Sequence, residues 1–233
     1  MKATSLEPQF LRRIRSFARR DSRMTEAQTQ AWEKWGPALR LPLEAGLLDF
    51  SSAFGRCAPC FLEIGFGSGQ SLAALAQQRP DLDFIGIETF KPGIGALLLQ
   101  IEALQLQNIR IYYADAVEVL ERCIPDQSLQ GIQIFFPDPW PKRRHHKRRL
   151  IQAPFVSLAS RKLKQAGLLH LATDWQDYAN GMIKVLSAES ALQNVAGAGQ
   201  FAERSSLRPR ITKFEGRGEK EGRPIWELQF AKI

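Results

Sequence analysis

Residues 60–69 of the chain read CFLEIGFGSG: an apolar run that holds one acid ends in three glycines at alternate positions. The run has the length of a buried strand, and the glycines let the backbone turn sharply with no Cβ in the way. Further apolar runs of strand length lie at residues 83–88, 109–114, 131–136 and 167–173, and helical stretches lie at 70–79, 94–106, 150–164 and 175–187. This alternation predicts an α/β fold with a doubly wound, mostly parallel sheet.

The two ends of the chain differ from this alternating region. Residues 1–50 are a basic segment with helical patches, followed by Pro, Gly and Ser residues. We therefore expect a basic N-terminal extension over residues 1–50 and one α/β domain over residues 51–233. A last apolar run, residues 225–231, follows a Gly-rich region and is expected to join the end of the sheet as an antiparallel strand.

Composition narrows the range of partners and compartments. The chain has 233 residues, 44% of them hydrophobic, with a net charge of +8. That charge favours a nucleic-acid partner, although a basic enzyme without one would carry it too. No apolar run approaches the ~20 residues that span a membrane, and no apolar secretion segment is present, so we expect a cytoplasmic protein with no membrane contact. Cys57 and Cys60 lack a second ligand pair, so we predict no metal site.

Acidic residues follow successive predicted strands, at the edge where ligands bind in open α/β sheets. Glu88 can accept both hydrogen bonds of a ribose diol, and Asp115 can take the exocyclic amine of an adenine. Each acid alone has the alternative of a helix cap or a solvated side chain. A dinucleotide site would need a small residue where Gln70 stands, and no P-loop lysine is present. The pattern predicts an adenosyl cofactor without phosphates, bound by the turn that holds Gly65 and Gly67, by Glu88, and by Asp115 with its neighbour Ala116.

Residues 135–149, FFPDPWPKRRHHKRR, form the most specific pattern in the chain. Asp138 lies between two prolines that fix the backbone and hold its carboxylate at the ligand crevice. Trp140 offers a face on which a base can stack. The basic residues that follow predict phosphate contacts, with a solvated face or a localisation signal as the alternative. His145 and His146 lack metal-ligand spacing, so contact with phosphate or solvent is the simpler interpretation.

Two further polar features lie near the predicted crevice. Asp174 ends the apolar run at 167–173, where it can either cap the next helix or face the ligand. Residues 208–218, RPRITKFEGRG, combine cations and one acid in a Gly-bounded loop, a composition that the fold alone does not require.

Together these segments resemble the bacterial tRNA (guanine-N7-)-methyltransferase family, from about residue 12 to the C-terminus. The matching segments are RSFARRDSRMTEAQ, FLEIGFGSG, GIE followed by KPGIGALL, NIRIYYADA, FFPDPWPKRRHHKRRL, LATDW and the RPRITKFEGRG…WEL tail. The PDPWPK…HHKRR and TKFE segments are specific, whereas the glycine segment alone is typical of class I methyltransferases in general. The chain departs from the family with Lys91 in the usual A-P-G-V-G segment and with Arg223 where a Gly-His pair is common.

The resemblance implies a seven-stranded class I methyltransferase fold and methyl transfer from S-adenosylmethionine to N7 of a tRNA guanine, guanine 46 of the variable loop. It implies that Glu63, Glu88, Asp115 and Asp138 surround the cofactor. It places the substrate at Lys142, Asp174, Thr212, Lys213, Phe214 and Glu215, and RNA at Arg144, His145, His146, Lys147, Arg148 and Arg149. Both a monomer and a homodimer are compatible with it.

Guanine N7 carries an in-plane lone pair, so its methylation requires positioning and stabilisation of positive charge but no proton removal. We therefore assign catalysis to Asp138, and recognition of guanine N1–H and its 2-amino group to Asp174 or Glu215. One alternative is an amino-methyltransferase acting on adenine in RNA, whose Asn/Asp-Pro-Pro-aromatic turn the segment Asp138–Pro141 approaches. Another is a non-catalytic RNA-binding protein of the same fold, although the strand-end acids are retained. A small-molecule methyltransferase would not need the basic run.

Overall fold

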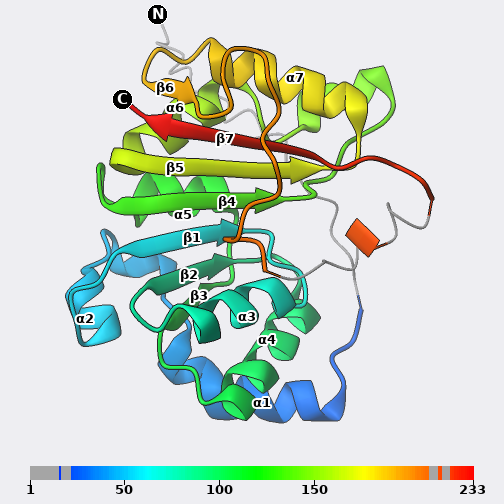
Figure 1. The fold of residues 1–233 in the computed structure, drawn as a ribbon. Helices are drawn as coiled ribbons and strands as arrows, with labels where there is room; N and C mark the ends of the chain where they lie inside the picture. Colours follow the sequence, from blue (N-terminus) through cyan, green and yellow to red (C-terminus); the bar gives the residue numbers. More distant parts are fainter. Residues whose placement is uncertain (1–15, 17–21, 210–214, 217–220) are drawn as a thin grey trace, which may run out of the picture.

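A seven-stranded sheet forms the centre of the structure, a computed structural model that describes residues 16, 22–209, 215–216 and 221–233. The strands are β1 (Cys60–Ile64), β2 (Asp83–Ile87), β3 (Ile109–Tyr112), β4 (Leu129–Phe135), β5 (Leu163–Thr173), β6 (Leu192–Asn194) and β7 (Trp226–Lys232). Their order is β3-β2-β1-β4-β5-β7-β6, with β7 antiparallel to β5 and β6 and the other pairs parallel (Figure 1). The order reverses between β1 and β4, which makes their carboxyl ends a topological switch point.

Helices pack around the sheet, and some of them begin at a residue whose side chain caps the first turn. They are α1 (Glu26–Leu39), α2 (Phe50–Phe54), α3 (Gln70–Gln78), α4 (Lys91–Leu104), α5 (Ala116–Arg122), α6 (Ala153–Lys162) and α7 (Gln176–Ser187), with 3-10 turns η1 (Leu43–Ala45) and η2 (Arg143–Arg148). Thr25 and Gln28 form a capping box at the start of α1. Asp115 caps α5 by accepting hydrogen bonds from two backbone amides of its first turn.

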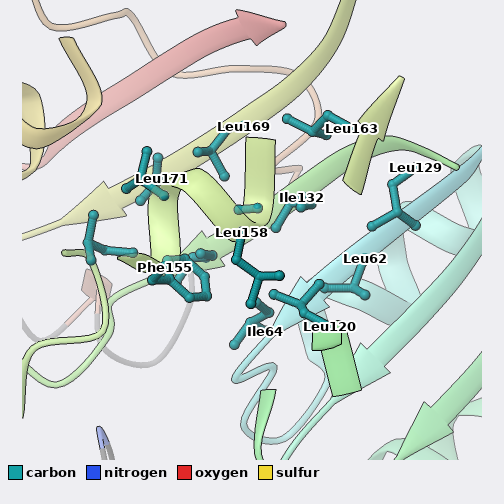
Figure 2. Packing of buried hydrophobic residues seen from close by; sticks show 14 of the residues in the cluster. Leu62, Ile64, Leu120, Leu129, Ile132, Phe155, Leu158, Leu163, Leu169 and Leu171 are labelled. Carbon is teal, nitrogen blue, oxygen red and sulfur yellow. The ribbon is translucent and has the colours of Figure 1, made fainter. Parts of the chain in front are cut away.

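Two apolar cores cover the two faces of the sheet. One lies between the sheet and helices α5, α6 and α7, where Leu62, Ile132 and Leu169 are fully buried (Figure 2). The other lies under α1, α3 and α4 and includes Phe61 and Phe84. Because side chains alternate along a strand, the neighbours Phe61 and Leu62 enter different cores. Burial on both faces explains why the sequence of these strands is an almost continuous apolar run.

A non-helical segment covers the second face over β4, β5 and β7. Residues 201–209, orange in Figure 1, cross this half of the sheet in place of a helix. Ala202 N–H donates to the backbone carbonyl of Glu227, and the side-chain amide of Gln133 donates to the carbonyl of Leu207. The side chains under this segment are therefore largely polar, in contrast to the apolar cores elsewhere.

The structure confirms the predicted doubly wound, mostly parallel sheet and its antiparallel last strand. It adds β6 and α5, which are too short to give a clear periodic pattern, and it resolves the helical patches near the start into α1. Ala31 and Leu39 of α1 are buried in the core under α4, and Leu48 packs against the other core. The segment expected as an N-terminal extension is thus packed on the domain from residue 26 onward.

The close approach of α4 to the glycine turn yields a stability prediction. A Cβ on Gly93 would lie 2.1 Å from the carbonyl oxygen of Gly67, a contact that backbone cannot relieve cheaply. We expect Gly93→Ala to lower the free energy of unfolding by about 1–3 kcal/mol, measured by urea unfolding. Gly181→Ala in α7 is the control, because its Cβ would meet its nearest neighbour at 4.0 Å. Equal stability of the two variants would contradict the described approach of α4.

Candidate functional site

A cavity of about 190 Å³ lies at the carboxyl ends of β1, β2, β3 and β4. Its walls come from the glycine turn after β1, from the residues that follow β2 and β3, and from the turn after β4. Ser16 also lines it. The charged side chains among the described lining residues are Glu88 and Asp138, both acidic. The cavity therefore favours a ligand that carries positive charge and no phosphate group.

Glu88 is held in place by the backbone of the glycine turn. One carboxylate oxygen accepts a hydrogen bond from Gly67 N–H at 2.8 Å, and the other accepts from Thr89 N–H at 2.7 Å and Phe90 N–H at 3.0 Å. Gly65 and Gly67 have φ angles of 75° and 59°, in the left-handed region that glycine tolerates. The turn and the acid thus fix each other, and the orientation of the carboxylate is set by the fold itself.

Glu63, on the last part of β1, is a buried acid with 5% of its surface exposed. It is not among the described residues that line the cavity. Burial, and secondarily the negative charge of Glu88, raise the pKa of Glu63 to about 8. Glu63 therefore holds a proton at neutral pH in this structure.

Asp115 lies beside the cavity and has a structural role. Its Oδ1 atom accepts hydrogen bonds from Val117 N–H at 2.9 Å and Glu118 N–H at 3.3 Å, which makes it the N-cap of α5. The residues on either side, Ala114 and Ala116, line the cavity. The helix-cap alternative that the sequence left open for Asp115 is thus realised in the structure, next to the predicted adenine position.

The turn after β4 carries Asp138 into the cavity wall and is conformationally strained. Phe136 and Trp140, on either side of the Pro137–Pro139 segment, have φ angles of 51° and 46°, which non-glycine residues rarely adopt. Phe136 N–H donates to the carbonyl of Ala172 at 2.8 Å, and Trp140 Nε1–H donates to the carbonyl of Ser16 at 3.1 Å. Interactions at both ends therefore hold the turn that presents Asp138.

Exposed cations follow this turn along η2. Lys142, Arg144, Lys147 and Arg148 are exposed, and the guanidinium of Arg148 lies over the ring of Trp140 at 4.8 Å from its centroid. Partial desolvation and the surrounding cations lower the pKa of His145, whose Nε2 accepts a hydrogen bond from Arg144. The segment presents a dense positive surface beside the cavity.

Arg149, which the sequence groups with these cations, lies apart from them. It is 8% exposed, and its guanidinium donates to the carbonyl of Pro139 at 2.8 Å and to Asp177 at 2.6 Å. His146 is half-buried, with Nε2 3.8 Å from the carboxylate of Asp177. The basic run therefore has an exposed part, from Lys142 to Arg148, and a buried end at Arg149.

The acids predicted to contact the substrate are both paired with arginines. Asp174, directly after β5, accepts a hydrogen bond from Nε of Arg223 at 2.9 Å and forms an ion pair with Nη2 of the same guanidinium at 2.7 Å. Glu215 is buried and forms ion pairs with Arg204 and Arg208. The predicted contacts Thr212, Lys213 and Phe214 lie outside the described residues.

Sequence reasoning missed the buried network that anchors Glu215. Arg208, 1% exposed, bridges Glu215 to Glu227 on β7. Glu227 also accepts from His170 on β5 at 2.6 Å, and these hydrogen bonds outweigh burial and lower its pKa. One feature of the sequence could have indicated this network: a histidine stands inside the apolar run GLLHLAT. A polar side chain buried in a strand requires a hydrogen-bond partner.

The described part of the chain shows neither a cluster of metal ligands nor a membrane-spanning helix. No group of three or more His, Cys, Asp or Glu side chains there is placed to hold a metal ion. Among the same residues, no helix combines the length and apolar composition needed to cross a membrane.

Comparison with known proteins gives close relatives over nearly the whole chain. The model of a family described as putative methyltransferase matches residues 57–228. The tRNA (guanine-N(7)-)-methyltransferase of Idiomarina loihiensis is 50% identical over 221 residues, which cover 95% of this chain and 90% of that protein. Proteins of the same name are 51% identical in Alcanivorax borkumensis, covering 95% of this chain and 92% of that one, and 46% identical in Escherichia coli, covering all of both chains.

Solved structures share the fold at low sequence identity. The 16S rRNA methyltransferase KamB superposes with a TM-score of 0.57 at 14% identity, covering 80% of this chain and 94% of that one. An antibiotic-related methyltransferase gives a TM-score of 0.54 at 15% identity, covering 82% and 94%. At these identities the likeness concerns the fold alone.

The buried proton on Glu63 predicts a specific dependence of stability on pH. The unfolded chain releases this proton near pH 4.5, whereas the folded chain keeps it up to about pH 8. Rising pH between these values therefore favours unfolding, by up to about 1.4 kcal/mol per pH unit, and the effect ends above pH 8. We expect Glu63→Gln to gain stability relative to the wild type from pH 5 to pH 8 in urea unfolding. A stability difference that stays constant over this pH range would contradict a buried protonated Glu63.

Proposed function

Because the chain belongs to the tRNA (guanine-N(7)-)-methyltransferase family, we propose that it transfers the methyl group of S-adenosylmethionine to N7 of a guanine in tRNA. The observation that carries the proposal is the cavity with two acids and no described cation in its lining, opening beside the exposed basic segment η2. The cavity suits a cationic, phosphate-free cofactor, and the basic segment suits a polyanionic substrate. We place the methylated guanine at position 46, in the variable loop, and the protein in the cytoplasm.

The cofactor's parts correspond to the chemistry of the lining. Apolar walls from Ile87, Phe90 and Ala116 suit the adenine ring. The ribose hydroxyls are expected to donate to the Glu88 carboxylate, which the glycine turn has already oriented. Asp115 remains our candidate for the adenine amine, and Asp138 is the candidate for the positively charged methionine amine. S-adenosylmethionine supplies the sulfonium methyl group that is transferred.

The reaction makes few demands on proton transfer, because N7 attacks through its own lone pair. The guanine gains positive charge as the methyl group arrives, so a carboxylate close to the ring stabilises the transition state more than the ground state. Asp138 is the lining acid on the β4 side of the cavity, on the turn that continues into Trp140 and η2. We assign it the dual role of positioning the cofactor and stabilising the developing charge.

Recognition of guanine requires an exchange of partners at Asp174 or Glu215. The N1–H and 2-amino groups of guanine form a donor edge that resembles the planar fork of a guanidinium. In the structure Asp174 binds such a fork from Arg223, and Glu215 binds those of Arg204 and Arg208. Arg223, more exposed than Arg208, is the easier one to displace. We therefore favour Asp174 as the acid that recognises guanine. We place Lys142, exposed at the start of the basic run, near the substrate phosphates.

The charge of Asp138 yields the most direct test of this chemistry. Asp138→Asn keeps the shape of the side chain and removes its charge, so we expect a turnover rate roughly a hundredfold lower, or about 2.7 kcal/mol. Single-turnover formation of 7-methylguanosine, with saturating tRNA and cofactor, measures it. Affinity for tRNA should barely change. A wild-type product of methyladenosine would contradict the proposed function, and an unimpaired variant would contradict the role of Asp138.

The exposed part of the basic run predicts a salt effect. Replacing Arg144, Lys147 and Arg148 by alanine should weaken tRNA binding and flatten the log–log salt dependence by somewhat under one unit per lost phosphate contact. Filter binding at several salt concentrations measures the slope. The matched control replaces Arg161, Lys164 and Lys184. These cations are exposed and lie at the end of α6, at the start of β5 and in the last part of α7, away from the carboxyl ends of the strands. Equal effects of the two triple variants would mean that charge alone, and not the position of η2, determines binding.

A further inference from the structure

Arg149 places its guanidinium inside the protein and engages it through Nε and Nη2. Nε donates to the carbonyl of Pro139 at 2.8 Å, Nη2 donates to Asp177 at 2.6 Å, and the group lies 4.7 Å from the ring centroid of Tyr178. Its side chain is 9% exposed. This burial leaves little of the guanidinium accessible to a phosphate, whereas Arg148 next to it is exposed.

The carbonyl that Arg149 binds belongs to the residue after Asp138. That carbonyl lies inside the strained turn, between Phe136 and Trp140 with their positive φ angles. Non-glycine residues rarely adopt such φ angles, and the conformation persists only where the surrounding structure holds it. The sheet holds one end of the turn, and Ser16 holds the other. Arg149 holds the middle, one peptide unit from the carboxylate-bearing residue.

The other partners of Arg149 belong to the start of α7, directly after Asp174. Asp177 is in the first turn of this helix, and the hydroxyl of Tyr178 accepts from Ile151 N–H at 3.0 Å. The hydrogen bond from Arg149 is the main cause of a lowered pKa of Asp177, which keeps this partner ionised. One guanidinium thus joins the turn with Asp138 to the helix that follows Asp174.

We infer that Arg149 is a positioning residue for methyl transfer: it fixes the Asp138 turn against α7 and makes no contact with tRNA phosphate. This role rests on the proposed function, because it assumes that Asp138 acts in the reaction. A lysine cannot replace it, since one ammonium lacks the planar fork that spans Pro139 and Asp177. Replacement of Arg149 leaves the exposed cations of η2 in place. It should therefore lower the rate of methyl transfer without changing RNA binding.

The test compares Arg149→Lys and Arg149→Ala with Arg148→Ala. Both Arg149 variants should lower the single-turnover rate at saturating tRNA and cofactor by about tenfold or more, with the salt dependence of tRNA affinity unchanged. Arg148→Ala, which removes an exposed cation of η2, should flatten the salt dependence of tRNA affinity. The inference is overturned if Arg149→Ala flattens the salt dependence as Arg148→Ala does while its saturated rate stays at the wild-type value.

Asp177→Ala tests the same link in case the Arg149 variants do not fold. Asp177 lies on the surface, with 64% of its side chain exposed, so its replacement should leave the fold intact. It should lower the saturated rate severalfold, and combining it with Arg149→Lys should add little, since both changes break one link. A wild-type rate for Asp177→Ala together with fully additive effects would overturn the link to α7. The wild-type nucleoside product is determined in the same assay, so failure of the proposed function is seen separately from failure of this inference.

Discussion

A strained turn, Phe136–Trp140, is the constraint on which the candidate site depends. Two non-glycine residues in the left-handed region would relax in an isolated peptide. Here the turn is held by β5 through Ala172, by Ser16 through Trp140, and by α7 through Arg149. Segments far apart in the sequence therefore cooperate to hold one carboxylate, that of Asp138, at the cavity wall.

The cavity is negatively charged because its described lining contains the acids Glu88 and Asp138 and no lysine or arginine. Glu88 is oriented by three backbone N–H groups, and its negative charge helps to keep Glu63 protonated behind it. No lysine or arginine is found among the described lining residues. The negative charge there favours a cationic ligand, whereas exposed cations gather outside the cavity, on η2. Negative and positive charge are thus separated between the cavity and the surface beside it.

Local patterns in the sequence were sufficient to predict the main strands and the place of Asp138. An apolar run followed by Pro-Asp-Pro needs no distant information, and the same holds for the glycine turn after β1. The burial of Arg149 could not be predicted from the sequence. Its partners Asp177 and Tyr178 come 28 and 29 residues later, and nothing in the basic run distinguishes Arg149 from Arg148.

Other details escaped sequence analysis for related reasons. Asp115 matched both an adenine contact and a helix cap, and only the short helix α5 shows that it is a cap. The partners of Glu215 depend on tertiary pairing with Arg208, which itself pairs with Glu227 on the last strand. The three-residue strand β6 is too short for a period to be visible. Local periodicity thus predicts elements, while long-range ion pairs and caps decide what individual acids do.

The central claim is that the turn after β4 and the glycine turn after β1 hold two acids around one cationic cofactor. A crystal structure of the protein with S-adenosylhomocysteine tests it most directly. We predict ribose hydroxyls within hydrogen-bond distance of Glu88, the amino group of the ligand facing Asp138, and positive φ angles retained at Phe136 and Trp140. A ligand bound away from Asp138, or a turn that relaxes when the ligand binds, would contradict the account.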